Sequence, residues 1–267
     1  MSAPALILLA HGSTLPVVSE VIRKMRAHMQ SVHPNIPVHI AFADHEHPTA
    51  QRVLSRLERS GVREAILVPL NLANLFNTST RLDEIMAAAQ ARCPKMTLSL
   101  ARPVGPETGL LNLIDLRLRQ ELACARVGEL DGLVLATEPS RDKRSRSILA
   151  RRARQWSLHH RLPALVASDS VGAAITQLRA EGRRHIAVGS MFLTAHDTYA
   201  QCRADAIGAG AIAVAKPIGF APEVCDMAFG RYSVAAMDLL RFGPDEASDG
   251  EDVPETSASA QLHVVGA

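Results

Sequence analysis

A continuous apolar run occupies positions 5–10, and a histidine, a glycine and a serine follow it directly. Such a run, ended by a turn signal, is typical of a strand buried on both faces of a parallel sheet. Similar runs alternate with stretches that have the apolar spacing of an amphipathic helix, which predicts an α/β fold with helices on both faces of the sheet. In the first half we expect strands at 5–10, 38–43, 65–70 and 96–101, and helices at 16–31, 49–60, 81–92 and 108–124.

The second half of the chain repeats the first. Residues 182–190 (GRRHIAVGS) match residues 61–69 (GVREAILVP), and residues 215–219 (AKPIG) match residues 101–105 (ARPVG). Because the elements also come in the same order, we expect two tandem lobes, each a parallel sheet flanked by helices. The predicted domains are residues 1–125, residues 128–242 and an acidic tail, 243–267, whose composition predicts disorder.

Polar side chains that can bind a metal or a polar ligand follow three predicted strands of the first lobe. In open α/β sheets, ligands bind beyond the carboxyl ends of the strands, so we expect these residues at one edge. The second lobe carries Thr137 in place of the first histidine, and we interpret that lobe as a structural partner with His196 as an exception. The first-lobe residues are His11, then Asp44, His45 and His47, then Asn71, Asn74 and Asn77.

Composition excludes several classes of function. The net charge is +2 and aromatic residues make up 3% of the chain, so neither a nucleic acid nor a membrane is an expected partner. The four cysteines form no CxxC pair, which favours reduced thiols in a cytoplasmic protein. The first apolar run is too short for a signal peptide or a membrane span. No strand is followed by GxGxxG, and GxxxxGK[ST] is absent, which disfavours a nucleotide-binding protein.

Four segments, read together in their tandem arrangement, resemble a known family. They are LLAHGS near the N-terminus, AFADHEHP after the second strand, GVREAILVPL and RPVG. They are similar to the class II tetrapyrrole chelatases, above all the sirohydrochlorin chelatases of the CbiX/SirB type, over about residues 4–235. The resemblance implies a chelatase-like fold. It also implies a lyase, of the ferrochelatase or cobaltochelatase type, that inserts Fe²⁺ or Co²⁺ into sirohydrochlorin or a related tetrapyrrole without ATP.

The resemblance also implies which residues act. His11 matches the first active-site histidine of the family, and Asp44 falls where the family tends to carry an acidic residue. The second histidine of the family falls on Asn77, and an amide oxygen binds a divalent metal more weakly than an imidazole does. If no other residue supplies the missing imidazole, the alternative function is that of a non-catalytic tetrapyrrole or metal carrier.

Two replacements for the second imidazole are open. One of His45 and His47 can face the cleft, since the two side chains alternate in direction, and His196 of the second lobe is the other candidate. An imidazole suits metal insertion because it is largely neutral at cytoplasmic pH and binds borderline divalent metals, and a nearby carboxylate can orient it. The predicted catalytic residues are His11, Asp44 and His47, and the predicted metal ligands are His11, His47 and His196.

The macrocycle of such a substrate is large and flat and carries many carboxylates. It needs apolar side chains against its faces, and arginines, amides or hydroxyls at its edge. No cofactor is expected besides the substrate metal, Fe²⁺, Co²⁺ or Ni²⁺, and two lobes in one chain can form the cleft as a monomer, with a homodimer as the alternative. The predicted substrate contacts are Ser13, Asn74, Phe76, Asn77 and Arg102, with Thr14, Leu72, Leu75, Arg81, Met191 and Phe192 as further candidates.

Overall fold

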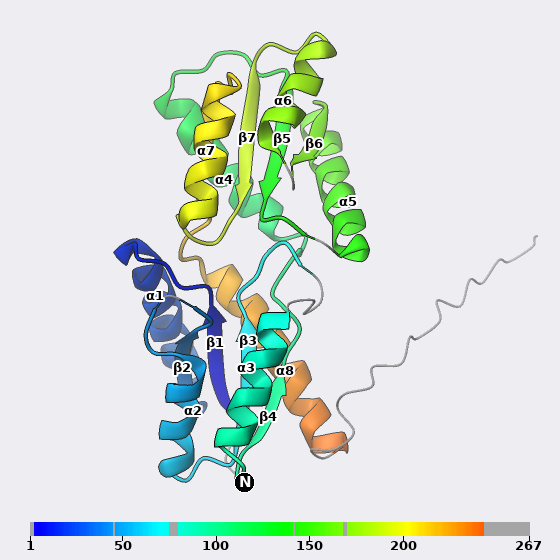
Figure 1. Ribbon diagram of the computed structural model, residues 1–267. Helices are drawn as coiled ribbons and strands as arrows, with labels where there is room; N and C mark the ends of the chain where they lie inside the picture. The colour runs from blue at the N-terminus through cyan, green and yellow to red at the C-terminus, as the bar shows by residue number, and fades with distance from the viewer. Residues whose placement is uncertain (1–2, 45, 75–79, 141, 168–169, 243–267) are drawn as a thin grey trace, which may run out of the picture.

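The computed structural model describes residues 3–242 apart from 45, 75–79, 141 and 168–169. It contains two four-stranded parallel sheets, one in each lobe (Figure 1). The strand order is β2-β1-β3-β4 in the first sheet and β6-β5-β7-β8 in the second, so the lobes share one topology and the predicted two-lobed α/β fold is confirmed. The strands are β1 (Ala5–Ala10), β2 (Val38–Phe42), β3 (Glu64–Pro69), β4 (Thr97–Leu100), β5 (Gly132–Thr137), β6 (Ala164–Ala167), β7 (Ile186–Met191) and β8 (Ala213–Val214).

Helices cover both faces of each sheet, as the hydrophobic periodicity predicts. On one face of the first sheet, Ile7 and Leu9 of β1 share a core with Leu54 and Leu57 of α2 and with residues of α3. Helices α6 and α7 cover the equivalent face of the second sheet. The helices are α1 (Pro16–Val32), α2 (Ala50–Arg59), α3 (Thr80–Arg92), α4 (Leu110–Cys124), α5 (Lys143–His160), α6 (Val171–Ala180), α7 (Asp197–Gly208) and α8 (Pro222–Phe242).

The remaining face of each sheet is covered in part by the last helix of the other half of the sequence. Helix α4, which ends the first repeat, packs on β7 and β8, and helix α8, which ends the second repeat, packs on β3 and β4 (Figure 1). Ile114 of α4 lies so close to Gly189 of β7 that a Cβ added there would come within 2.7 Å of its side chain. The sequence repeats, residues 1–125 and 128–242, therefore do not coincide with the two structural lobes. Each lobe includes the last helix of the other repeat.

Two arginines at equivalent positions of the two repeats fix this exchange of helices. Arg117 of α4 donates to the Ile218 carbonyl from Nε at 3.0 Å and from Nη2 at 2.8 Å. Arg231 of α8 donates from Nε to the Pro103 carbonyl at 3.0 Å and pairs with Glu107. Pro103 belongs to the segment RPVG and Ile218 to KPIG, so each of these segments anchors the helix that arrives from the opposite half.

The carboxyl ends of both sheets point into the region between the lobes (Figure 1). The loop after β3 is held at this edge by the segment RPVG, because the Gly105 N–H donates to the Asn71 carbonyl at 2.9 Å. A Cβ added at Gly105 would lie 2.0 Å from the Leu72 carbonyl oxygen, so only glycine allows this approach of two backbones. The glycine therefore positions residues 71–74 at the interlobe edge.

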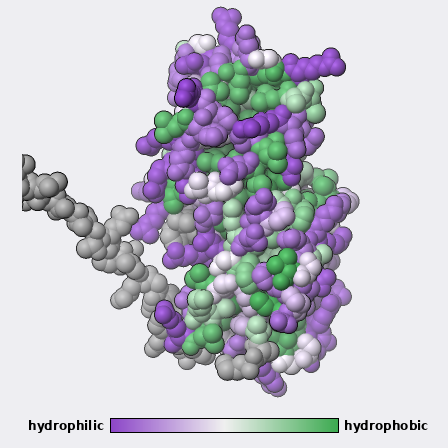
Figure 2. Space-filling model, turned by 180° about the vertical axis from the view of Figure 1, so that it is seen from behind, coloured by the Kyte–Doolittle hydropathy of each residue, from purple (hydrophilic) through white to green (hydrophobic). Residues whose placement is uncertain are grey.

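No helix in the described part of the chain is long and apolar enough to cross a membrane. The face seen in Figure 2 is largely hydrophilic, and its hydrophobic side chains gather in separate patches on both lobes. All four cysteines are described, and all are free thiols.

Candidate active site between the two lobes

His11 and Asp44 form a pair at the carboxyl edge of the first sheet. His11 follows β1 directly and Asp44 is the second residue after β2. Because β1 and β2 pair in parallel with Ala10 opposite Phe42, the two strand ends lie side by side. The His11 Nδ1 lies 3.5 Å from one oxygen of the Asp44 carboxylate, and the other oxygen accepts the Gly12 N–H at 2.8 Å. A carboxylate at Nδ1 favours the tautomer whose lone pair is on Nε2. The His11 side chain is 55% exposed, so this nitrogen is open to a ligand.

Gly12 makes the pair possible. A Cβ at this position would lie 2.1 Å from the Asp44 carbonyl oxygen and 2.8 Å from the Glu46 Cβ, contacts that no side chain tolerates. The absence of a side chain lets the β1 end and the β2 end approach closely enough for the Gly12 N–H to reach the carboxylate. The glycine of the segment HGS thus serves the placement of Asp44.

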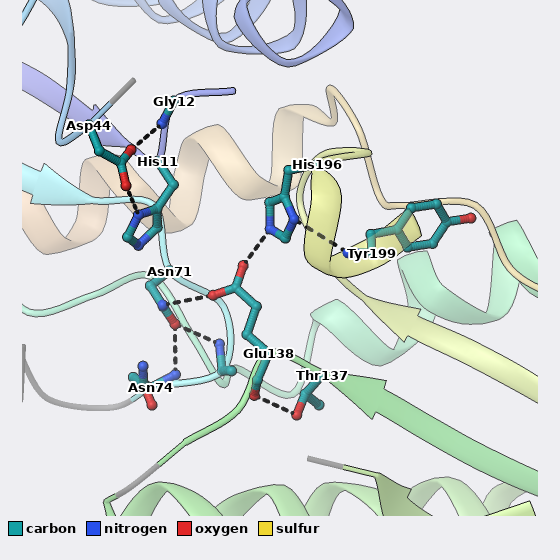
Figure 3. Close-up of polar contacts among 10 residues, drawn as sticks. His11, Gly12, Asp44, Asn71, Asn74, Thr137, Glu138, His196 and Tyr199 are labelled. Carbon is teal, nitrogen blue, oxygen red and sulfur yellow. Dashed lines mark hydrogen bonds and ion pairs between the residues drawn. The ribbon is translucent and has the colours of Figure 1, made fainter. Parts of the chain in front are cut away.

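Asn71, the second residue after β3, joins the two lobes. Its Oδ1 accepts the N–H groups of Ala73 and Asn74, both at 2.9 Å, and so closes the turn at residues 71–74. Its Nδ2 donates to the Glu138 Oε2 at 3.1 Å. Glu138 follows β5 in the second lobe, so this hydrogen bond crosses between the two sheets (Figure 3).

His196 approaches the same carboxylate from the second lobe. Its Nε2 lies 3.0 Å from the Glu138 Oε1, and its Nδ1 accepts the Tyr199 N–H at 3.4 Å as the N-cap of α7. Burial alone lowers the pKa of His196, but the hydrogen bond and the negative charge of Glu138 outweigh it, so the pKa lies above its ordinary value. The ring is 14% exposed and fixed at both nitrogens.

These side chains form one continuous arrangement across the interlobe edge. His11 lies beside Asn71, because β1 and β3 are paired and the Leu70 N–H donates to the Leu9 carbonyl at 2.8 Å. Figure 3 shows both imidazoles, the Asn71 amide and the Glu138 carboxylate around one region. No lysine or arginine among the described residues pairs with either carboxylate. We call Asp44, His11, Asn71, Glu138 and His196 the interlobe row.

The other predicted site residues lie around this row in different ways. His47 is exposed, and the described contacts of the interlobe row do not include it. The Ser13 hydroxyl accepts the Leu15 N–H at 3.2 Å and so holds the turn after β1. The Asn74 Oδ1 is buried and without a hydrogen-bond partner among the described residues, and Arg102 is exposed. His45, Leu75, Phe76 and Asn77 lie outside the described residues.

Two sequence-based interpretations need correction. Leu72, Met191 and Phe192 are 2%, 1% and 0% exposed, so they do not line an open cleft. Phe192 instead packs its ring edge-on against the ring of His196, with ring centroids 5.7 Å apart. The second lobe is also more than a structural partner with one histidine, because it supplies Glu138. An acidic residue directly after a strand was the available signal for Glu138.

Solved structures of the same architecture define the class of this fold. SirB from Bacillus subtilis subspecies spizizenii, in complex with cobalt, matches with a TM-score of 0.72 at 16% identity, over 88% of this chain and 96% of SirB. CbiX, the terminal enzyme for biosynthesis of siroheme in denitrifying bacteria, matches with a TM-score of 0.59 at 20% identity, over 86% of this chain and 99% of CbiX. The protein thus has the two-lobed chelatase fold.

Sequence comparison finds relatives of the first half of the chain. The family model CbiX matches residues 5–121, which include His11, Asp44 and Asn71. The sirohydrochlorin cobaltochelatase of Methanosarcina acetivorans is 22% identical over 124 residues, which is 44% of this chain and 95% of that relative. Residues 5–121 therefore match the CbiX family, and the chain as a whole has the fold of the solved SirB and CbiX structures.

Proposed function

We propose that this protein inserts a divalent metal, Fe²⁺ or Co²⁺, into sirohydrochlorin or a related tetrapyrrole, and that His11 is both a metal ligand and a proton acceptor. The observation that carries the proposal is the pair of His11 and Asp44 at the open edge of the lobe that matches the CbiX family. The relatives named above support metal insertion into sirohydrochlorin in general. Ni²⁺ is a third metal that histidine and carboxylate ligands accept.

The chemistry follows from the geometry of this pair. Insertion exchanges two pyrrole N–H protons for one metal ion, so the site needs a transient metal ligand and an acceptor for the protons. The Asp44 carboxylate holds His11 through Nδ1, which leaves the lone pair on Nε2 for a ligand. The lone pair of Nε2 can first hold the ion and, as the ion moves into the macrocycle, take up one of the two pyrrole protons, while the other passes to solvent.

We further propose that the second lobe completes the metal site, because position 77 is an asparagine. The Tyr199 N–H engages the Nδ1 of His196, so the metal-binding nitrogen is Nε2, which now contacts Glu138. An ion at this point would replace the proton on Nε2, which would pass to solvent, and would bond to the imidazole and to the carboxylate beside it. His47, exposed on the loop that follows β2, is the other candidate imidazole.

The rest of the first-lobe edge supplies the proposed contacts to the macrocycle. Arg102 is exposed and suits a substrate carboxylate. Asn74 belongs to the segment of residues 71–74 that Asn71 and Gly105 position. Phe76 and Asn77 lie outside the described residues and stay predicted contacts. Ser13 is proposed to act through the turn it closes rather than through its engaged hydroxyl.

The decisive experiment is a metal-insertion assay. Purified protein is mixed without oxygen with sirohydrochlorin and Fe²⁺, Co²⁺ or Ni²⁺, and the absorption spectrum is followed against the spontaneous reaction. We expect His11→Ala to slow the enzymatic rate by about a hundredfold or more, as for loss of a general base. The control is His185→Ala, at the amino end of β7 and therefore at the opposite end of the second sheet. Undiminished turnover in His11→Ala would overturn the assignment.

A carrier function has one observation in its favour, which is Asn77 in place of the second histidine of the family. A carrier would bind the tetrapyrrole or the metal tightly and leave the insertion rate at its spontaneous value. The variant Asn77→His separates the cases further. A faster reaction in this variant means that the natural site is a weakened one, and a slower reaction means that the amide has a task of its own.

A further inference from the structure

Three metal-binding side chains meet between α4 and α5, away from the interlobe row. Asp115 comes from α4, and His159 and His160 are the last residues of α5. One potential ligand atom from each lies within 4.8 Å of the other two, and no other three or more histidines, cysteines and acids among the described residues meet in this way. Two imidazoles and a carboxylate are the ligand set that suits Zn²⁺, Co²⁺ and Ni²⁺.

The carboxylate of this cluster is held in one orientation. Asp115 is 9% exposed, and its Oδ1 accepts the Trp156 Nε1–H at 3.0 Å while its Oδ2 accepts the Arg119 Nη2–H at 2.7 Å. His160 is fixed against it, with Nε2 2.6 Å from Oδ1. Ligands locked by their neighbours favour metal binding, because little side-chain freedom is lost when the ion enters.

His159 is the adjustable member of the cluster. It is exposed, and its ring stands at 87° to that of His160 with centroids 4.8 Å apart. It borders a pocket of about 220 Å³ that Asp115 also lines, together with the amides of Asn112 and Gln155. The pocket offers room for an ion with a water molecule, and its amides offer further oxygen ligands.

The position on α5 favours a cation and separates this cluster from the candidate active site. The helix begins at the interlobe edge, directly after the loop that follows β5, and its 18 residues span about 27 Å. His159 and His160 therefore lie at its far end. The carbonyl groups of a helix C-terminus carry a partial negative charge that stabilises a cation there.

We propose that Asp115, His159 and His160 form a second divalent-metal site, of the Zn²⁺, Co²⁺ or Ni²⁺ class, which ties α4 to α5. The ion replaces the proton on the His160 Nε2, which passes to solvent, and the hydrogen bond to Asp115 becomes two metal–ligand bonds. With such bonds at about 2.0–2.2 Å, the two ligand atoms need to move apart only to about 3 Å. Since α4 belongs to the first repeat and α5 to the second, the ion would cross-link the two halves.

The test measures Zn²⁺ binding to the untagged protein in a His11→Ala/His196→Ala background, which removes the imidazoles of the interlobe row. Calorimetric titration should show one bound equivalent, and Zn²⁺ should raise the midpoint of thermal unfolding. Adding His159→Ala should weaken this binding at least tenfold and abolish the thermal shift, whereas adding His28→Ala, whose described ring contact is to Phe220, should change neither.

The exposed His159 is chosen because its removal leaves the hydrogen bonds of Asp115 in place, so the variant folds. Zinc binding that persists in the His159→Ala variant, or no bound equivalent in the background protein, would overturn the proposal and leave the cluster as a hydrogen-bond network only. Metal insertion by otherwise unmodified protein is expected to survive His159→Ala, so the outcome is independent of the proposed function.

Discussion

At the scale of single residues, the candidate site depends on a missing side chain as much as on the ones present. Gly12 lets the ends of β1 and β2 approach, and its N–H holds one oxygen of Asp44 while the other faces His11. The segment HGS is short, but its members differ in what they do in the structure. His11 presents an exposed imidazole, Gly12 allows the approach and Ser13 closes the turn. The placement of His11 and Asp44 at neighbouring strand ends could be predicted, because it depends only on two paired strands, whereas the turn that Ser13 closes was not predicted.

Gly12→Ala should impair metal insertion strongly. The added Cβ would overlap the Asp44 carbonyl oxygen, so the loop must move and the carboxylate must leave His11. We expect the insertion rate to fall about tenfold or more, with thermal unfolding as the measure of any loss of fold. Gly128→Ala is the matched control, because nothing lies within 4 Å of a Cβ at that position. Equal rates in the two variants would contradict the role given to Gly12.

Glu138 could not be assigned from sequence, since its importance depends on how two distant strand ends face each other. It stands 67 positions from Asn71 in the chain, and only the folded arrangement brings the two side chains together. The same limit applies to Phe192, because an apolar residue after a strand can line a cleft or support one, and a local pattern does not distinguish the two.

Glu138→Gln should weaken metal binding more than it weakens the fold. The glutamine keeps the size and a carbonyl oxygen for Asn71 or His196, but it removes the negative charge that attracts a divalent ion. We expect the affinity for Co²⁺, followed by absorption spectroscopy, to fall about tenfold, a loss of about 1.4 kcal/mol. Glu129→Gln, which removes an 80%-exposed carboxylate near His185, is the control and should leave the affinity unchanged.

At the scale of the elements, the predicted strands and helices were located well because the apolar periodicity is clear. The expected helix at 16–31 is α1 (Pro16–Val32), and the expected strand at 65–70 is β3 (Glu64–Pro69). Periodicity shows that a helix has a buried face but not which sheet covers it. The packing of α4 on the second sheet was therefore beyond the sequence.

The N-cap residue of α5, Asp142, allows the contribution of a helix cap to stability to be tested. Asp142 accepts the N–H groups of Arg144 and Ser145 at 3.1 Å and 2.8 Å. Removing such a cap with Asp142→Ala should lower the free energy of unfolding by about 1 kcal/mol at neutral pH. Asp142→Asn should preserve most of it, because asparagine caps helices equally well. Denaturant titration measures the difference.

The same cap should depend on pH. Partial burial raises the pKa of the Asp142 carboxyl, but the hydrogen bonds from Ser145 and Arg144 outweigh it and hold the pKa below its ordinary value. The charged cap therefore adds stability above the unfolded pKa of about 4 and loses it as the pH falls through the lower folded pKa. Any advantage over Asp142→Asn should be present at about pH 6 and shrink by about pH 3. A constant difference would refute this account.

At the scale of the whole molecule, the exchanged helices make the two halves interdependent. If residues 1–125 were separated from the rest, their sheet would lack α8. The side of α4 that packs on β7 and β8 would also be left uncovered. Arg117 would also lose its acceptor, the Ile218 carbonyl. Neither half therefore has a complete core of its own.

A fragment of residues 1–125 should consequently not be a stable monomer. We expect it to dimerise, with the α4 of each copy on the sheet of the other, or to aggregate. Light scattering after gel filtration gives the mass, and circular dichroism gives the fold. A monomeric fragment that unfolds at the temperature of the full chain would contradict the interdependence.

The helix exchange also bears on the symmetry of what the protein can hold. Two identical lobes that exchanged helices would form a twofold pair in which each edge residue occurs twice. In one continuous chain the two edges are free to differ, and here Thr137 and Glu138 occupy the positions that correspond to His11 and Gly12. Two unlike walls can distinguish the two faces, or the unequal sides, of an asymmetric macrocycle. Joining the halves thus gives the site a means to bind a flat ligand in a single orientation.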